Sequence, residues 1–352
     1  MSLKINKADF VGKKVLVAPL DWGLGHSTRC IPIIKDLISA GAYVWLAGER
    51  QQKILLQKEF PQLPFLELQG YRIRFSTRGF VWKLMMQIPK ILFAIRSENS
   101  WLKNKIIKYG FDLIISDNRY GLFHKDAKCI FITHQLSIKT GLGKWSELIL
   151  QHINYRFINR FNECWIPDEE GESNLAGELS HPKFFPTTPL KYIGTQSRLE
   201  KLIGQETENH LLIILSGPEP QRTIFEKIIM KELSVYKGTA TVVRGLPIAE
   251  REIISTETVQ FYNHLSAKLF NEEIVKANFI LSRSGYSTIM DIQKLNKKSI
   301  LIPTPEQSEQ EYLASYLFKK QLAYCVLQNE FSLKTALEEA KKFDYKFLQQ
   351  RN

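Results

Sequence analysis

Small and polar residues gather between Phe279 and Ala314, in an order typical of an anion-binding site. The apolar run Phe279–Leu281 stops at the turn Ser282–Gly285, and apolar residues then recur with helical spacing. A helix that starts at such a turn points unpaired N–H groups and the positive end of its dipole at a ligand. Serine hydroxyls, the small Gly285 and the Arg283 cation favour the same anion. The turn therefore predicts a diphosphate site.

An acid follows one turn into the predicted helix. Ser287 and Asp291 are four residues apart and so share a face of that helix. A carboxylate at this position accepts hydrogen bonds from both hydroxyls of a ribose while the turn holds the phosphates. We therefore expect a nucleoside diphosphate to bind along Ser284, Gly285, Tyr286, Ser287 and Asp291.

A histidine in a glycine-rich loop is the candidate general base. His26 lies in the run Gly23–Arg29, and Asp117 follows the apolar run Asp112–Ser116. Histidine exchanges protons near neutral pH, and a carboxylate partner orients its ring. The pair predicts removal of a proton from an acceptor hydroxyl. The alternative is that His26 caps a helix or contacts phosphate, and that Asp117 only forms a turn.

Composition limits the classes of protein that fit. The chain has 352 residues with 44% hydrophobic and 24% charged content, which is typical of globular domains. No apolar run approaches the ~20 residues of a membrane-spanning helix, and the first residues lack a cleavable leader pattern. We therefore expect a cytoplasmic protein. Four scattered cysteines without a CxxC pair argue against a zinc site, so no metal is expected.

The net charge of +12 predicts an acidic partner. No zinc-finger spacing or RNA-recognition signature is present, so no specific nucleic acid is expected. Nucleoside diphosphates and anionic lipid headgroups remain as candidates.

Strand and helix patterns alternate along the chain, which predicts parallel sheets covered on both faces. The rhythm stops in a Pro- and Thr-rich stretch after residue 186 and restarts at Leu211. We expect an α/β fold of two Rossmann-like doubly wound domains that face each other across a cleft. The predicted bounds are 1–193 for an acceptor-binding domain, 194–335 for a nucleotide-sugar-binding domain, and 336–352 for a helix across the junction. Ligands are expected at the carboxyl ends of the strands.

The motifs resemble those of a known family. The RSG(x)5D run from Arg283 to Asp291, an I-P-x-P loop and a QEY helix start at Gln310 resemble the C-terminal half of family 28 glycosyltransferases. That family includes the UDP-N-acetylglucosamine transferase of peptidoglycan assembly and has the GT-B fold. The GLGHSTR loop, Thr133-His134-Gln135 and Ser216-Gly217 resemble motifs of the same superfamily.

The resemblance implies roles for individual residues. Asp291 takes the place of the acid that binds the ribose, and Gln310 and Glu311 match the pair that contacts the donor sugar. Leu265 and Ser266 fall where the base is held. Further donor-side residues are Ser216, Gly217, Arg222, Arg283, Ser284 and Gly285. Acceptor-side residues are Gly23, Gly25, Arg29, His134 and Gln135. The first loop of the second half departs from the pattern because Pro218 and Pro220 replace glycines.

The implied activity is an inverting, metal-independent transfer of a hexose or N-acetylhexosamine from a UDP-sugar to an unidentified acceptor, with no cofactor. A UDP-sugar 2-epimerase-like enzyme and a non-catalytic nucleotide-sugar-binding protein remain as alternatives. The acceptor, the sugar and the base stay open.

The segment from residue 71 to residue 96 is basic and apolar. Its cations are Arg72, Arg74, Arg78, Lys83, Lys90 and Arg96, with no acid among them. Such a composition suits contact with anionic lipid, so we expect peripheral contact with the inner face of the cytoplasmic membrane and a lipid-linked acceptor. The alternative is an ordinary helix pair packed on the first sheet.

Overall fold

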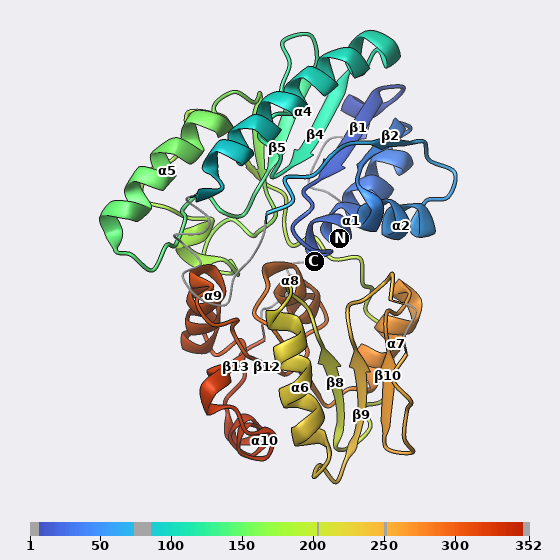
Figure 1. The fold of residues 1–352 in the computed structure, drawn as a ribbon, viewed down its shortest axis with the longest axis vertical. Coiled ribbons are helices and arrows are strands. Elements are labelled where there is room, and N and C mark those ends of the chain that lie inside the picture. Colours follow the sequence, from blue (N-terminus) through green and yellow to red (C-terminus); the bar gives the residue numbers. More distant parts are fainter. Residues whose placement is uncertain (1–6, 74–85, 203, 250–251, 348–352) are drawn as a thin grey trace. The chain divides into compact units, whose positions relative to one another are not determined.

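The computed structural model describes residues 7–73, 86–202, 204–249 and 252–347. Its described residues form two compact units, and the chain passes from the first to the second between Gln196 and Ser197. The expected boundary lay after residue 193. Each unit is a parallel sheet with helices packed on it, so both are Rossmann-like α/β domains, as predicted (Figure 1).

The N-terminal unit has a seven-stranded parallel sheet in the order β3-β2-β1-β4-β5-β6-β7. Its strands are β1 (Lys14–Pro19), β2 (Tyr43–Gly48), β3 (Phe65–Glu67), β4 (Leu113–Asp117), β5 (Lys128–Ile132), β6 (Glu163–Ile166) and β7 (Leu190–Tyr192). Its helices are α1 (Gly25–Ser39), α2 (Arg50–Glu59), α4 (Ile88–Tyr109) and α5 (Lys144–Ile158), with short 3-10 turns at Lys7–Phe10 and Gly177–Leu179.

Alternating residues of the strands fill two cores, because the sheet is buried on both faces. Val15 and Val17 of β1 pack with α1 and α2 on one face. Leu16 and Ala18 of the same strand face the other core, which includes Leu102 of α4 and residues of α5. The near-continuous apolar runs of the sequence follow from this double burial.

The C-terminal unit has a six-stranded parallel sheet in the order β10-β9-β8-β11-β12-β13. Its strands are β8 (His210–Ile214), β9 (Thr239–Val243), β10 (Val259–Tyr262), β11 (Phe279–Ser282), β12 (Ser299–Leu301) and β13 (Tyr324–Cys325). Its helices are α6 (Gln221–Leu233), α7 (Ala267–Lys276), α8 (Tyr286–Lys294), α9 (Ser308–Lys319) and α10 (Leu333–Lys342), with a 3-10 turn at Gln328–Glu330.

The last helix packs within the C-terminal unit. Leu333, Ala336, Leu337 and Ala340 recur on one face of α10, and all four are buried in the same core as Phe225 of α6. The sequence prediction put a helix from residue 336 across the domain junction. Its apolar face instead completes the core beside α6 and β12.

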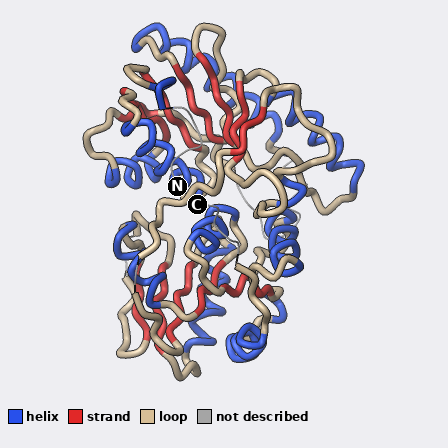
Figure 2. The backbone as a smooth tube through the Cα atoms, turned by 180° about the vertical axis from the view of Figure 1, so that it is seen from behind, coloured by secondary structure: helices blue, strands red, loops and turns tan. Residues whose placement is uncertain are grey.

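In each sheet the strand order reverses beside the strand that comes first in the sequence, β1 or β8. The candidate sites lie at this point. β1 lies next to β4, with Pro19 opposite Asp117, and β8 lies next to β11, with Ile214 opposite Ser282. The loops that leave neighbouring strands at such a point turn to opposite faces and leave a crevice. Figure 2 shows the strands of each sheet running side by side toward these loops.

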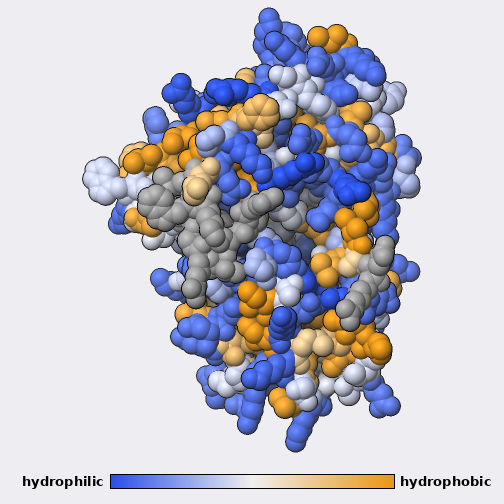
Figure 3. All heavy atoms as spheres, viewed as in Figure 1, coloured by the Kyte–Doolittle hydropathy of each residue, from blue (hydrophilic) through white to orange (hydrophobic). Residues whose placement is uncertain are grey.

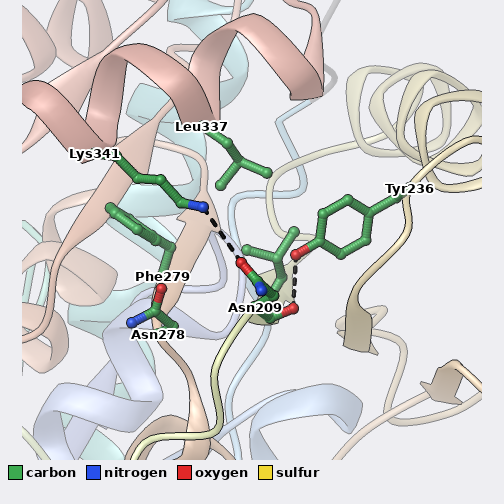
Figure 4. A pocket seen from close by; sticks show the side chains of 7 residues that line it. Asn209, Tyr236, Asn278, Phe279, Leu337 and Lys341 are labelled. Carbon is green, nitrogen blue, oxygen red and sulfur yellow. Dashed lines mark hydrogen bonds between the residues drawn. The ribbon is translucent and has the colours of Figure 1, made fainter.

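The opposite, amino-terminal edge of the second sheet holds only a small cavity of about 40 Å³ (Figure 4). Lys341 Nζ donates to Asn209 Oδ1 at 3.3 Å, and the Tyr236 hydroxyl donates to the Asn209 carbonyl at 2.7 Å. This volume has room for water and none for a nucleotide. The carboxyl edge is therefore the place to look for a ligand.

Candidate active site

His26 and Asp117 meet at the switch point of the first sheet. His26 is the second residue of α1, Asp117 is the last residue of β4, and His26 Nδ1 lies 2.8 Å from Asp117 Oδ1. Asp117 is fully buried, whereas the His26 side chain keeps 14% exposure. The buried carboxylate thus contacts Nδ1 of the ring, as an orienting partner of a general base does.

Arg29 joins this pair from the same face of α1, one turn after His26. Its Nε donates to Asp117 Oδ2 at 2.6 Å, and its second terminal nitrogen donates to Asp117 Oδ1. Another guanidinium nitrogen lies 3.2 Å from His134 Nδ1. Because the bidentate pair neutralises the carboxylate, the cluster is a His–Asp–Arg arrangement and not a simple dyad.

Burial and charge act in opposite directions on the acids of this cluster. Burial alone would raise the pKa of Asp117, but Arg29 and then His26 outweigh it and hold the pKa well below its usual range. Asp117 is therefore an anion at neutral pH. The neighbouring Cys30 thiol is buried, and burial together with Asp117 raises its pKa well above the usual value, so the thiol is protonated and unreactive.

The remaining acceptor-side residues surround the same loop. Gly23 has a φ of +74°, which L side chains rarely adopt, and Gly25 begins α1. His134 is buried beside Arg29. Gln135 follows it, but its carbonyl accepts a 2.9 Å hydrogen bond from Asn154 of α5, which ties its backbone to that helix. The cluster thus contains His26, Arg29, Asp117 and His134.

In the C-terminal unit, the turn before α8 leaves helical N–H groups without a side-chain cap. Gly285 is the residue before the helix and makes no side-chain cap. A Cβ built on Gly285 meets no atom within 4 Å, so the space beside the turn is open. Ser284 is buried and donates to the Gln310 carbonyl at 2.8 Å, and Ser287 is half-buried on the first turn. An uncapped helix start of this kind can bind an anion, and the expected contact with a diphosphate stays a prediction.

Arg283 does not have the position that a diphosphate ligand requires. Its side chain is fully buried, and its guanidinium donates to the Ile302 carbonyl at 3.2 Å and the Pro303 carbonyl at 3.1 Å. The guanidinium carbon also lies 4.0 Å from the centre of the Phe225 ring. Burial lowers the pKa of Arg283 to about 9. Arg283 thus holds the loop after β12 and packs on α6. The structure gives it a structural role in place of the expected contact with phosphate.

Asp291 lies one turn further along α8 and is half-buried. It accepts a short hydrogen bond from the Ser197 hydroxyl, and Lys294 Nζ donates to the Ser197 carbonyl at 3.3 Å. Burial raises the pKa of Asp291 to about 6, against the opposing effects of Ser197, Arg198 and Lys294. The carboxylate thus anchors Ser197, the first residue of the C-terminal unit, to α8.

Gln310 and Glu311 shape the loop that precedes α9. Gln310 Oε1 accepts from the Thr304 N–H at 2.9 Å, and Glu311 Oε1 accepts from the Glu306 N–H at 3.1 Å. The Ser284 bond to the Gln310 carbonyl links this loop to the turn before α8. The structure therefore brings Ser284, Gln310 and Glu311 into one loop cluster.

The loop after β8 is arranged differently from the expectation. Ser216 and Gly217 follow the strand, and Gly217 has a φ of +105°. Arg222 is buried and paired with Glu219 at 2.6 Å and with Glu226 at 3.4 Å, so its charge is already balanced. Glu219 also accepts from the Thr223 N–H at 3.2 Å. A carboxylate thus lies where a phosphate at the start of α6 would lie.

Leu265 and Ser266 begin α7. Leu265 is buried, and the Ser266 hydroxyl caps the helix by accepting from the Leu269 N–H at 3.3 Å. Ser266 is therefore an ordinary N-cap, and the expected contact with a base stays a prediction.

Among the described residues, no group of three or more His, Cys, Asp and Glu side chains is placed to hold a metal ion. In the same part of the chain, no helix has the length and apolar character to cross a membrane.

One family model matches part of the chain. Residues 255–351 match the model of the glycosyltransferase family 28 C-terminal domain. The matched residues lie within the C-terminal unit. No curated protein matches the chain.

Solved structures share the fold at low sequence identity. MurG of Acinetobacter baumannii is 12% identical with a TM-score of 0.54, over 94% of this chain and 91% of that one. Arabidopsis thaliana UGT89C1, complexed with UDP-L-rhamnose, is 11% identical with a TM-score of 0.59, over 94% of both chains. A putative UDP-N-acetylglucosamine 2-epimerase from Listeria monocytogenes is 10% identical with a TM-score of 0.59, over 94% of this chain and 88% of that one. These structures share the fold of this chain, and the family 28 match concerns its C-terminal unit.

Two features escaped the sequence prediction. The pairing of Arg29 with Asp117 was missed, although the i, i+3 spacing of His26 and Arg29 on a helix is a visible signal. The pairing of Glu219 with Arg222 was also missed, although the same i, i+3 spacing indicates it.

Proposed function

We propose that this glycosyltransferase moves a hexose or N-acetylhexosamine from a UDP-sugar to an acceptor hydroxyl with inversion at the anomeric carbon. The observation that carries the proposal is the His26–Asp117 contact of 2.8 Å at the switch point of a Rossmann-like unit, in a chain whose other unit is a family 28 domain. The UDP preference is supported by the UDP-sugar bound to a structural neighbour.

The base step follows from the ring geometry. In the tautomer with its proton on Nδ1, His26 donates to Asp117 Oδ1, and the lone pair on Nε2 takes the proton of the acceptor hydroxyl. Arg29 Nη2, which lies 2.9 Å from the same Nδ1, then donates to Asp117 and not to the ring. The hydroxyl oxygen forms a bond to the anomeric carbon as the bond from that carbon to the diphosphate oxygen breaks. The imidazolium that results donates a hydrogen bond to the Asp117 carboxylate, which holds it and Arg29 together.

The leaving group takes the bonding electrons and becomes a diphosphate of higher charge. In this proposal, the amides of residues 285–288 at the start of α8 and the Ser287 hydroxyl stabilise this charge, which the uncapped helix start supports. The step is metal-independent in this proposal and needs no cofactor. Undiminished turnover in excess EDTA is the corresponding test.

Ribose recognition requires Asp291 to exchange partners. Its carboxylate accepts from Ser197 in the structure, and a ribose diol would replace or share that hydrogen bond. Gln310 and Glu311 hold the neighbouring loop through Thr304 and Glu306, so their contact with the donor sugar is through the shape of that loop or through the remaining oxygens.

A lipid-linked acceptor is part of the proposal. Residues 74–85 of the basic and apolar segment lie outside the described residues. In its described part, Met86 is 80% exposed and Phe93 is 71% exposed at the start of α4, beside Lys90. Exposed apolar side chains next to a cation support contact with anionic lipid.

The experiment is an assay of UDP release from a panel of UDP-sugars with His26→Ala. We expect the loss of nearly all turnover while UDP binding persists. His152→Ala is the matched control, because His152 is exposed on α5 and lies outside the cluster. Equal turnover in wild type and His26→Ala would remove His26 as the base.

Two alternatives predict no acceptor-dependent release of UDP, and analysis of the donor after incubation distinguishes them. The similarity to a putative 2-epimerase supports an epimerase-like reaction, which would convert the donor to its epimer without any acceptor. The Glu219 carboxylate at the start of α6 supports a non-catalytic nucleotide-sugar-binding protein. In that case UDP-sugars would bind and no donor would be consumed.

A further inference from the structure

A cavity of about 550 Å³ lies in the N-terminal unit, between α4 and the segment from β3 to Arg72. One face of α4 supplies the first wall, where Lys90, Ala94, Ser97 and Trp101 recur at intervals of three or four residues. Residues 67–72 supply the other wall. The volume is in the range of pockets that hold small molecules.

The charges of the cavity are balanced within the unit. Each of the three acids in the described lining is paired with a cation, at 2.7–2.9 Å: Glu49 with Arg72, Glu67 with Lys53 and Glu98 with Arg119. Lys90 is the remaining cation of the described lining, and its ammonium donates to the Arg72 carbonyl. The cavity therefore carries little net charge, which favours a neutral polar ligand over a phosphate or a nucleotide.

The uncharged groups of the lining suit a sugar. Trp101 is half-buried, and its Nε1 donates to the Glu67 carbonyl at 3.0 Å, which fixes the indole. Gln69 and Ser97 are exposed, and their side chains both donate and accept hydrogen bonds. Figure 3 shows hydrophilic and hydrophobic side chains intermixed over the part of the surface where Figure 1 places α4. An aromatic ring beside amide and hydroxyl groups matches the apolar face and the hydroxyls of a pyranose.

The backbone of the cavity is strained at Arg72. Its φ of +49° lies in the left-handed region that residues other than glycine rarely adopt. The Asp21 carboxylate holds this conformation, because it accepts from the N–H groups of Tyr71 and Arg72, both at 2.9 Å. A Cβ on Gly70 would lie 2.3 Å from the same carboxylate, so this approach requires glycine. Strain that the surrounding structure fixes in this way is common at ligand sites.

Asp21 also connects the cavity with the candidate base. It lies five residues before His26, in the loop that leads into α1. The described lining nevertheless includes none of the cluster residues His26, Arg29, Asp117 and His134. A group in the cavity is therefore bound to a wall that is fastened to the His26 loop, and it is not the group whose hydroxyl reacts at His26.

We propose that this cavity is a saccharide subsite and that the acceptor is a glycan of at least two sugar units. One unit occupies the cavity, where Trp101 stacks on its ring and Gln69 and Ser97 bind its hydroxyls. Another unit presents the reacting hydroxyl to His26. The inference rests on the proposed function and adds the class of the acceptor, of which a lipid-linked glycan is one member.

Saturation-transfer NMR on the full chain without nucleotide tests the subsite. The probes are N-acetylglucosamine, N,N′-diacetylchitobiose, maltose and cellobiose, and we expect at least one disaccharide to bind. Ser97→Trp should weaken that binding at least about tenfold, because the added indole fills the cavity. Trp101→Ala should weaken it at least about fivefold through the lost aromatic contact. Ser100→Trp is the matched control, since Ser100 is exposed on the same helix outside the described lining, and it should bind like the wild type.

UDP release with the same saccharides as acceptors separates this inference from the proposed function. Ser97→Trp should raise KM for the disaccharide at least about tenfold and leave KM for the monosaccharide nearly unchanged. Both serine variants should keep the wild-type thermal midpoint, because the changed side chains are exposed. Disaccharide binding that Ser97→Trp leaves undiminished, or no binding of any probe, would overturn the subsite. Binding that Ser97→Trp blocks, in a protein that releases no UDP, would support the subsite and contradict sugar transfer.

Discussion

Asp291 gives the sharpest stability prediction. Its replacement by Asn raises the free energy of unfolding if burial destabilises the carboxylate, and lowers it if the carboxylate is a stabilised anion. Burial raises the pKa of Asp291 to about 6 from 3.8. The folded state therefore binds more protons than the unfolded state between pH 4 and pH 6. The free energy of unfolding accordingly falls as pH rises through this window, and the cost of the buried anion is fully present above it.

The magnitude follows from the pKa difference of about two. At about 1.4 kcal/mol per pKa unit, the ionised carboxylate costs the C-terminal unit up to about 3 kcal/mol. Asp291→Asn keeps an acceptor for the Ser197 hydroxyl and removes the charge. We expect it to stabilise this unit by about 1–3 kcal/mol at pH 7.5 and to change it little at pH 4.

Urea unfolding followed by circular dichroism at the two pH values measures this difference. All six tryptophans precede residue 197 in the sequence, so tryptophan fluorescence reports the N-terminal unit and serves as an internal control. Ser197→Ala is the companion variant, and it should destabilise by about 1 kcal/mol at pH 7.5 because it removes a hydrogen bond to the anion. If Asp291→Asn destabilises the protein equally at both pH values, the carboxylate is a stabilised anion and the reasoning is wrong.

Three further predictions concern catalysis, the core and the donor site. His26→Ala should lower kcat by about 10²–10⁴-fold with an unchanged thermal midpoint, measured by steady-state UDP release; a comparable loss in His152→Ala would show that the effect is not specific to the cluster. Arg283→Met should destabilise the C-terminal unit by about 2–4 kcal/mol in urea, since the Ile302 and Pro303 carbonyls lose their donor; weaker UDP binding at unchanged stability would instead restore a phosphate role. Glu219→Gln should tighten UDP binding by ~2–5-fold in calorimetry, because it removes a carboxylate from the start of α6; unchanged affinity would place the phosphates elsewhere.

The sequence predicted the fold well because double burial leaves a plain signal. Apolar runs are followed by a turn and a helical pattern at Lys14–Pro19 and at Leu211–Leu215. This pattern is typical of buried parallel strands. Parallel strands bring their carboxyl ends to one edge of the sheet. The sequence could therefore predict that His26 and Asp117 lie together, as they do in the structure. The alternating strand and helix patterns therefore predicted both the fold and part of the candidate site.

The direction of long polar side chains could not be predicted in the same way. Arg283 stands in a polar turn beside two serines, but its guanidinium folds under the turn onto Phe225. Arg222 likewise turns to Glu219 and Glu226. Residue type and spacing place a Cα on an element, whereas the rotamer depends on which carbonyls and carboxylates the tertiary structure leaves nearby.

The exposed apolar face of α5 was also not predicted from the sequence. Trp145, Ile149 and Ile153 of α5 are exposed, although their helical spacing is typical of a core face. Only the buried contacts of Gln151 and Asn154 show that this helix is turned the other way.

Hydrogen–deuterium exchange with and without UDP tests the central claim most directly. The account predicts slower exchange of the amides of residues 285–288 when UDP binds, and no such protection by uridine, which lacks the diphosphate. Protection that is absent, or that is confined to residues before 197, would contradict the assignment of the turn before α8 as the donor site.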